Sequence, residues 1–226
     1  MTTVIRTEDV WKTYSLGSPR QVDAVKGASI EIPKGVITGI GGPSGSGKTT
    51  LLSLIGLLTK PSKGKVFIED KEVSALSEVF RTKFRRERIG FIFQAQYLIP
   101  QLTATENVAI PKLCTDTSRG EAERLAREKL SSLGLGHRLD FRVAELSGGE
   151  QQRVSIARSL MNSPEILIAD EPSSSIEEAL TKDLLATLRE MVDRDELTVI
   201  VASHDPLVLG WCDRLYTMRD GEIVIQ

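Results

Sequence analysis

An eight-residue stretch, 42–49, restricts the possible folds more than any other part of the chain. Its sequence, Gly-Pro-Ser-Gly-Ser-Gly-Lys-Thr, fits the pattern G-x-x-x-x-G-K-[ST], which belongs between a buried strand and a helix. The apolar residues 36–40 predict that strand, and the leucine-rich residues 50–58 predict that helix. A glycine-rich turn there points backbone N–H groups into one concavity, beside the positive end of the helix dipole. We therefore predict a binding site for a nucleoside triphosphate.

Two side chains at the end of this stretch favour phosphate chemistry over a purely structural turn. Lys48 can reach the β- and γ-phosphates, and the Thr49 hydroxyl can bind Mg²⁺. A strand-to-helix turn that used glycine only for tightness would explain the glycines. It would not explain a lysine and a threonine at the mouth of the turn, so we favour the phosphate site.

The composition of the 226-residue chain narrows the remaining classes. A formal net charge of −2 gives no electrostatic reason for a nucleic-acid partner, because such domains usually carry a basic excess. The longest apolar run, 51–58, is too short to span a bilayer, and the first residues lack the order of a secretory signal. Cys114 and Cys212 lie far apart without metal or redox spacing. We therefore expect a cytoplasmic protein that binds no nucleic acid.

The order of the predicted elements indicates an α/β fold. Two or three short strands are predicted before the P-loop, the 42–49 turn, at residues 4–10, 22–26 and 29–32. From residue 95 onwards strand patterns give way to helical periodicity, until a buried strand returns at 165–169. We predict a P-loop NTPase core with a mostly parallel sheet, an N-terminal antiparallel β lobe and an inserted α-helical subdomain. In this prediction residues 1–226 form one domain, with a core lobe at 1–94 and 164–226 and the helical subdomain at 95–163.

Four polar residues follow predicted core strands and are candidate site residues. They are Gln94, after strand 89–93; Asp170 and Glu171, after strand 165–169; and His204, after strand 197–202. Ligands of open α/β sheets bind at the carboxyl ends of the strands, and an aspartate there, in a P-loop protein, is typical of the Mg²⁺ site. The alternatives are an exposed acidic turn and a histidine that only completes a turn. The shared sheet edge favours the site.

Tyr14 lies upstream of the P-loop, together with Trp11. Its ring could stack on a purine base, because an aromatic face suits a flat π-system. Both aromatic residues could instead cover the edge of the small antiparallel sheet. Spacing alone leaves both interpretations open.

Residues 146–151, Leu-Ser-Gly-Gly-Glu-Gln, combine a helix cap with an anion site. Ser147 and Glu150 form a capping box, which predicts a helix that runs on to Leu160. The cap does not require Gly148 and Gly149, which cost helix stability and expose backbone N–H groups at a helix N-terminus. We expect both roles at once.

Taken together, these motifs resemble the nucleotide-binding subunits of ABC transporters over nearly the whole chain. The matching positions are residues 42–49 as Walker A, Asp170 as the Walker B aspartate, Glu171 as the catalytic glutamate, Gln94 as the Q-loop, His204 as the switch histidine, Tyr14 as the A-loop and 146–151 as the signature. A P-loop alone is shared by many ATPase and kinase families. The signature between the Q-loop and Walker B narrows the resemblance to one superfamily.

The resemblance implies which residues bind ATP and Mg²⁺. The ATP-binding residues would be Tyr14, Gly42, Pro43, Ser44, Gly45, Ser46, Gly47, Lys48, Thr49, Thr50 and Gln94. The Mg²⁺ ligands would be Thr49, Gln94 and Asp170, and the catalytic residues Glu171, His204 and Lys48. Two copies would pair head to tail as a homodimer, so that the second copy contacts ATP in trans through Ser147, Gly148, Gly149 and Gln151.

The resemblance also implies partners in the membrane. Such subunits dock on separately encoded integral membrane permease subunits, which would place this chain peripherally on the cytoplasmic face of the cell membrane. The stretches 91–94, 98–103 and 105–108 are similar to the subgroup of lipoprotein-releasing, macrolide-efflux and cell-division ATPases, and this favours export. The transported substrate is not encoded here, because the transport path lies in the membrane subunits.

One stretch departs from the family pattern. The D-loop, residues 174–177, reads Ser-Ser-Ile-Glu, where the family usually ends in aspartate. Glu177 keeps the charge and adds a methylene, which would alter ATPase rate and cooperativity but not nucleotide binding.

Two other functions compete with a transport ATPase. Soluble ABC-type ATPases of chromosome, repair or ribosome factors carry coiled-coil insertions, zinc cysteines or tandem halves, and we find none in the sequence. A P-loop switch or a small-molecule kinase would not need the signature or the water-polarising Glu171.

Overall fold

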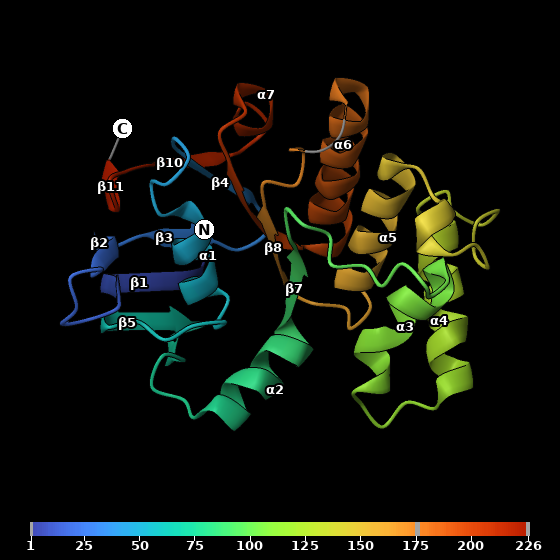
Figure 1. Ribbon diagram of the computed structural model, residues 1–226, viewed down its shortest axis with the longest axis horizontal. Helices are drawn as coiled ribbons and strands as arrows, with labels where there is room; N and C mark the ends of the chain where they lie inside the picture. Colours follow the sequence, from blue (N-terminus) through green and yellow to red (C-terminus); the bar gives the residue numbers. More distant parts are fainter. Residues whose placement is uncertain (1, 175–176, 225–226) are drawn as a thin grey trace.

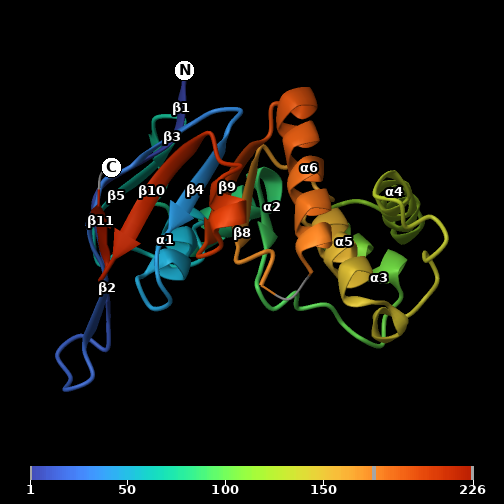
Figure 2. The same cartoon turned by 90° about the horizontal axis from the view of Figure 1, so that it is seen from above.

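Two β-sheets and a group of helices make up the computed structural model, which describes residues 2–174 and 177–224 (Figures 1 and 2). Ser175 and Ile176 of the predicted D-loop lie outside the described residues. Within the described ranges, no helix is both long enough and apolar enough to cross a membrane.

The central sheet positions the candidate site. Its six strands within residues 2–174 and 177–224 follow the order β11 (Glu222–Val224), β10 (Arg214–Arg219), β4 (Ile37–Gly41), β9 (Thr198–Ser203), β8 (Ile166–Asp170) and β7 (Ile89–Ile92). The strands from β10 to β7 are parallel, and β11 is antiparallel to β10. Gly41 pairs with Ser203, and Ala202 pairs with Asp170. The loops after β4, β9 and β8 therefore leave the sheet at the same edge.

The N-terminal sheet is antiparallel. Its strands are β2 (Val22–Ala28), β1 (Thr3–Tyr14), β5 (Lys63–Ile68) and β6 (Lys71–Glu72), with β3 (Glu31–Pro33) also paired to β1. β1 is longer than the predicted strand 4–10, because Trp11 pairs with Lys63 and Tyr14 pairs with Val22. A register shift between Val10 and Lys12 bends the strand at this point.

Apolar cores lie on both faces of the central sheet. Helix α1 (Lys48–Ile55) lies between the two sheets (Figure 2), where Leu51 and Leu54 are fully buried among side chains from both. Helix α6 (Glu178–Asp195) covers the other face, where Leu188 packs in a second core. The remaining helices of the core region are α2 (Glu78–Arg88) and the short α7 (Pro206–Leu209).

The helical region between β7 and β8 has a core of its own. It contains α3 (Ala104–Leu113), α4 (Arg119–Ser132), the 3₁₀ turn η1 (Val143–Glu145) and α5 (Gly148–Ser159). Val108, Leu130 and Val154 are buried together in this core. Ile156 of the same helix α5 is buried in the core beneath α6. Helix α5 therefore joins the helical region to the central sheet.

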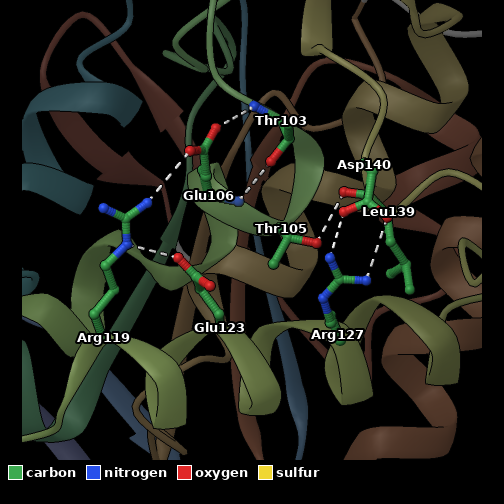
Figure 3. A network of polar contacts seen from close by, with 8 residues as sticks. All are labelled: Thr103, Thr105, Glu106, Arg119, Glu123, Arg127, Leu139 and Asp140. Carbon is green, nitrogen blue, oxygen red and sulfur yellow. Dashed lines mark hydrogen bonds and ion pairs between the residues drawn. The ribbon is translucent and has the colours of Figure 1, made fainter.

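Polar contacts fix the start of α3 against α4 and the loop before η1. Figure 3 shows the residues involved: Thr103, Thr105, Glu106, Arg119, Glu123, Arg127, Leu139 and Asp140. Thr103 and Glu106 form a capping box, with the Glu106 N–H donating to Thr103 Oγ1 at 3.1 Å and the Thr103 N–H donating to the Glu106 carboxylate at 2.9 Å. Arg119 of α4 lies between Glu106 and Glu123, 3.7 Å and 2.7 Å from their carboxylates.

Candidate nucleotide-binding site

The P-loop connects β4 to α1 and contains three glycines with positive φ angles, Gly42, Gly45 and Gly47, of which the first and the last are also closely packed. Gly42 and Gly47 have φ angles of 149° and 103°, a region that L side chains rarely adopt. A Cβ atom on Gly42 would lie 2.3 Å from the Met218 carbonyl oxygen, and one on Gly47 would lie 2.3 Å from the Ala24 carbonyl oxygen. Backbone from β2 and β10 therefore encloses the loop, which leaves no room for side chains at these two positions.

Lys48 begins α1 and folds back over the loop. Its Nζ donates to the carbonyl oxygens of Gly42 at 2.8 Å and Pro43 at 3.1 Å, and it lies 3.5 Å from Glu171 Oε1. The side chain is only 6% exposed. An ammonium group held at this place can donate to an anion above the loop, which is the position expected for the β- and γ-phosphates.

A cavity of about 600 Å³ surrounds the loop. The stretch 43–50 lines it, together with Gln94, Glu171 and His204. The sheet register explains this grouping, because β4, β7, β8 and β9 are parallel neighbours whose following loops meet at one edge. The structure thus brings together most of the residues that the sequence analysis singled out.

Glu171 and His204 face each other across the ends of β8 and β9. His204 Nδ1 lies 3.0 Å from both carboxylate oxygens of Glu171, and the Ser203 hydroxyl lies 3.4 Å from Oε2. Glu171 has a φ angle of 47°, and its N–H donates to the Ala202 carbonyl at 2.9 Å. This left-handed turn aims a carboxylate into the cavity between Lys48 and the imidazole.

Asp170 has the chemistry of a Mg²⁺ ligand. Burial raises its pKa and the charge of Glu171 adds to this, while a hydrogen bond from Thr49 and the charge of Lys48 oppose it. Its Oδ1 is buried and has no hydrogen-bond partner among the described residues. A buried carboxylate oxygen of this kind, beside the Thr49 hydroxyl, fits a hard cation that prefers oxygen ligands.

The signature residues lie at the start of α5, away from the P-loop cavity. Ser147 caps the helix, and the Glu150 carboxylate accepts from the Ser147 N–H at 2.8 Å and from Arg138 Nε at 2.8 Å. Within residues 2–174 and 177–224 no signature residue lines the cavity. The start of α5 nevertheless lies on the same side of the molecule as the carboxyl ends of the central strands (Figure 2).

The residues at the signature differ in exposure. Ser147 and Gly148 are exposed, whereas Gly149 is buried against α6, where a Cβ atom would lie 2.8 Å from Leu180 Cδ1. Gln151 donates from Nε2 to the carbonyl oxygens of Val143 and Leu146 at 3.1 Å and 3.0 Å. Of the two glycines expected to expose backbone N–H groups, only Gly148 is therefore on the surface. The Gln151 side-chain amide points toward the backbone that precedes α5.

Tyr14 lies at the end of β1, paired with Val22, which lines the cavity. Its ring is 44% exposed, and Lys12 Nζ lies 5.2 Å from the ring centroid. Tyr14 does not itself line the cavity within the described ranges. This placement is compatible with both interpretations, a stacking surface for a base and a cover for the sheet edge.

One wall of the cavity was missed by the sequence analysis. It comes from residues 22–24 and Lys26 of β2 and from the turn Asp220–Gly221. The Gly221 N–H donates to the Ser46 carbonyl at 3.0 Å, and the Lys26 N–H donates to the Gly221 carbonyl at 2.8 Å. The Asp-Gly pair signalled a hairpin turn, but no local pattern could show that this turn touches the P-loop.

Sequence comparison with known proteins supports the family that the motifs suggested. The family model described as ABC transporter matches residues 25–174. The chain is 40% identical over 219 residues to the lipoprotein-releasing system ATP-binding protein LolD 2 of Caulobacter vibrioides, covering 97% of this chain and 94% of that protein. It is also 40% identical over 224 residues to the macrolide export ATP-binding/permease protein MacB of Salmonella typhimurium, covering 99% of this chain but only 34% of that protein.

Solved structures agree with this assignment. The dimeric cassette MJ0796 bound to ADP and Pi superposes with a TM-score of 0.90 at 37% identity, over 98% of this chain and 97% of that one. The cbiO1 structure from Clostridium perfringens, described as part of the transporter complex cbiONQ, gives 0.88 at 28% identity over 100% and 88%. The predicted fold class is confirmed, and so is the predicted family. The chain belongs to the ABC transporter family, as an ATP-hydrolysing subunit.

Proposed function

We propose that ATP is closed between two copies of this subunit, with the P-loop of one copy facing the signature of the other. One observation carries the proposal: the P-loop cavity contains Gln94, Glu171 and His204 but, within the described residues, no part of the signature. Ser147 and Gly148 are exposed at the start of α5, a position that suits an anion. The MJ0796 cassettes are described as dimeric, which supports a two-copy site.

Hydrolysis requires a water molecule in line with the γ-phosphorus and a group that takes up its proton. The Glu171 carboxylate is 12% exposed and is held by His204 and Lys48. We assign to Glu171 the acceptance of the proton as the water oxygen bonds to phosphorus and the bond to the ADP oxygen breaks. His204 orients that carboxylate and the water, and Lys48 stabilises the negative charge on the phosphate oxygens.

Thr49, Gln94 and Asp170 are the proposed ligands of Mg²⁺. The buried, unpartnered Oδ1 of Asp170 supports this assignment. Mg²⁺, when bound, neutralises charge on the β- and γ-phosphate oxygens.

A groove beside the nucleotide cavity is the proposed docking site for a membrane permease subunit. Its volume is about 620 Å³, and its lining includes the apolar side chains of Leu58, Phe91, Phe93 and Tyr97 as well as three arginines, Arg85, Arg86 and Arg158. Tyr97 is 70% exposed. A groove lined by apolar side chains and arginines fits a short cytoplasmic segment that carries apolar and acidic side chains. This docking would place the subunit peripherally on the cytoplasmic face of the membrane.

Export is the proposed direction of transport. LolD proteins are named for lipoprotein release and MacB proteins for macrolide export, and the chain spans about a third of the MacB length. These names support export, with a large amphipathic or apolar substrate that passes through the membrane subunit.

The docking groove can be tested separately. Recovery of the chain from membranes together with an integral membrane protein, and its loss from the membranes on Phe93→Asp substitution, would support the groove as the docking site.

The two-copy site predicts how ATPase rate depends on protein concentration. If each site needs two copies, the rate per copy rises with concentration until the dimer is saturated, and the log–log slope of total rate approaches 2 at high dilution. A site complete within one copy gives a constant rate per copy. That second result would contradict the proposal.

A further inference from the structure

Arg158, in the last turn of α5, is a half-buried cation with an unusual set of partners. Its Nη1 donates to the Tyr97 carbonyl at 2.7 Å, and its Nη2 donates to the Gln96 carbonyl. Burial lowers its pKa, and no carboxylate of the described residues opposes that shift. A guanidinium taken out of water is costly unless its donors are satisfied. Here two of its donors go to backbone carbonyls, so the side chain holds a loop and does not balance a charge.

The loop that Arg158 holds follows directly on Gln94. Gln96 makes a second contact with α5, donating from Nε2 to Gln152 Oε1 at 2.8 Å. Tyr97 has a φ angle of 47°, a region that a bulky residue adopts only when its surroundings impose it. The two contacts from α5, six residues apart, therefore fix the course of the chain between the nucleotide cavity and the proposed docking groove.

The same helix carries the signature at its other end. Helix α5 begins at Gly148 and runs to Ser159 without interruption, so Ser147 and Arg158 lie roughly 16 Å apart along one rigid rod. Helix α5 therefore connects the loop 95–97 to the signature through one continuous element.

We propose that Arg158 is a positioning residue that sets Gln94 in the nucleotide cavity through the carbonyl groups of Gln96 and Tyr97, and couples this loop to the signature helix. The inference rests on the proposed role of Gln94 at the ATP and Mg²⁺ site. Arg158 touches no phosphate in this arrangement; it acts through the loop. Arg158 also lines the proposed docking groove, together with Tyr97. A protein segment bound in the groove would therefore contact both Arg158 and the loop 95–97.

The test uses Arg158→Met, which keeps the aliphatic stem and removes the donors. The control is Arg189→Met. Arg189 is also partly buried and donates to a backbone carbonyl, that of Trp211 at 3.0 Å, and it also pairs with the Asp213 carboxylate at 3.0 Å. Its removal therefore costs stability without breaking a contact to residues 94–98. We expect kcat of Arg158→Met to fall by about 10- to 100-fold, with KM for ATP changed by less than about threefold. Amide hydrogen exchange in residues 94–98 should rise in Arg158→Met and stay at the wild-type level in the control.

Three outcomes would overturn the proposal. The first is an unchanged kcat of Arg158→Met, and the second is unchanged amide exchange in residues 94–98. The third is a fall in kcat that Arg189→Met shows as well, when both variants have lost a similar free energy of unfolding. If Arg158→Met does not fold, Arg158→Gln decides the case: its amide nitrogen stands two bonds short of the arginine Nη atoms and cannot reach both carbonyls, so faster exchange in 94–98 and a lower kcat are expected, and wild-type values refute the coupling. Wild-type protein that hydrolyses no ATP would count against the proposed function instead.

Discussion

Replacing Glu150 with glutamine removes one negative charge from the start of α5. The carboxylate accepts from the Ser147 N–H and from Arg138, both at 2.8 Å, and these contacts, led by the Ser147 N–H, lower its pKa from 4.5 to about 2. A shift of that size corresponds to about 3 kcal/mol of preference for the ionised form. Solvent screening and the remaining amide oxygen reduce the loss, so we expect Glu150→Gln to lower the free energy of unfolding by about 1–2 kcal/mol at neutral pH.

The effect should depend on pH with a definite sign. Because the folded pKa lies below the unfolded value, the charge stabilises the fold above pH 4.5, and this stabilisation is lost as pH falls toward 2. Urea unfolding of wild type and Glu150→Gln at neutral pH and near pH 3.5 measures it. We expect the difference between the two proteins to shrink by about a third to a half at the lower pH.

The capping box of α3 supplies a control. Glu106 has the same position relative to Thr103, but its side chain is more exposed and lies 3.7 Å from Arg119. We expect Glu106→Gln to cost less than about 1 kcal/mol. A difference for Glu150→Gln that is the same at both pH values would show that packing, not charge, is lost and would refute the reasoning.

Three further substitutions, one of them with a matched control, test the nucleotide site. Gly47→Ala should destabilise the fold by about 1–3 kcal/mol, because its Cβ would strike the Ala24 carbonyl. Gly45→Ala should cost less in the same urea measurement, because Gly45 also has a positive φ angle, 78°, but has open space around it, so only the backbone strain applies. Asp170→Asn should leave the stability of the nucleotide-free protein unchanged or higher, since burial disfavours the charge, but abolish the extra thermal stabilisation that Mg²⁺ adds to ATP; retention of that increment would remove Asp170 from the Mg²⁺ site. Tyr14→Ala should raise the dissociation constant of ATP about tenfold if the ring stacks on the base, whereas an unchanged constant with lower stability would favour the sheet-edge interpretation.

Much of the fold follows from local patterns. Strands β8 and β9 are apolar segments of parallel-sheet type, and the P-loop marks the turn from β4 to α1. Once the strands are parallel neighbours, the ends that carry Gln94, Glu171 and His204 must meet at one edge. Motif and topology therefore predict the grouping around the cavity, while the roles of these residues stay predictions.

The rest depends on contacts between distant parts of the chain. The turn Asp220–Gly221 supports the P-loop, and Leu180 buries Gly149, but neither contact leaves a periodic signal in the sequence. Strand β1 continues through Tyr14 because β2 and β5 pair with it on both sides. Arg158 looks like an ordinary helical arginine until the structure places the carbonyls of Gln96 and Tyr97 beside it.

The central claim is that one copy supplies only half of each ATP site, and a mass measurement tests it directly. Glu171→Gln should bind ATP without hydrolysing it, so light scattering with ATP and Mg²⁺ should report twice the monomer mass of 24.8 kDa. Adding Ser147→Arg should block this dimer, whereas Ser118→Arg, at the matching cap of α4, should not. A Glu171→Gln protein that holds ATP as a monomer, or a dimer indifferent to Ser147→Arg, would contradict the claim.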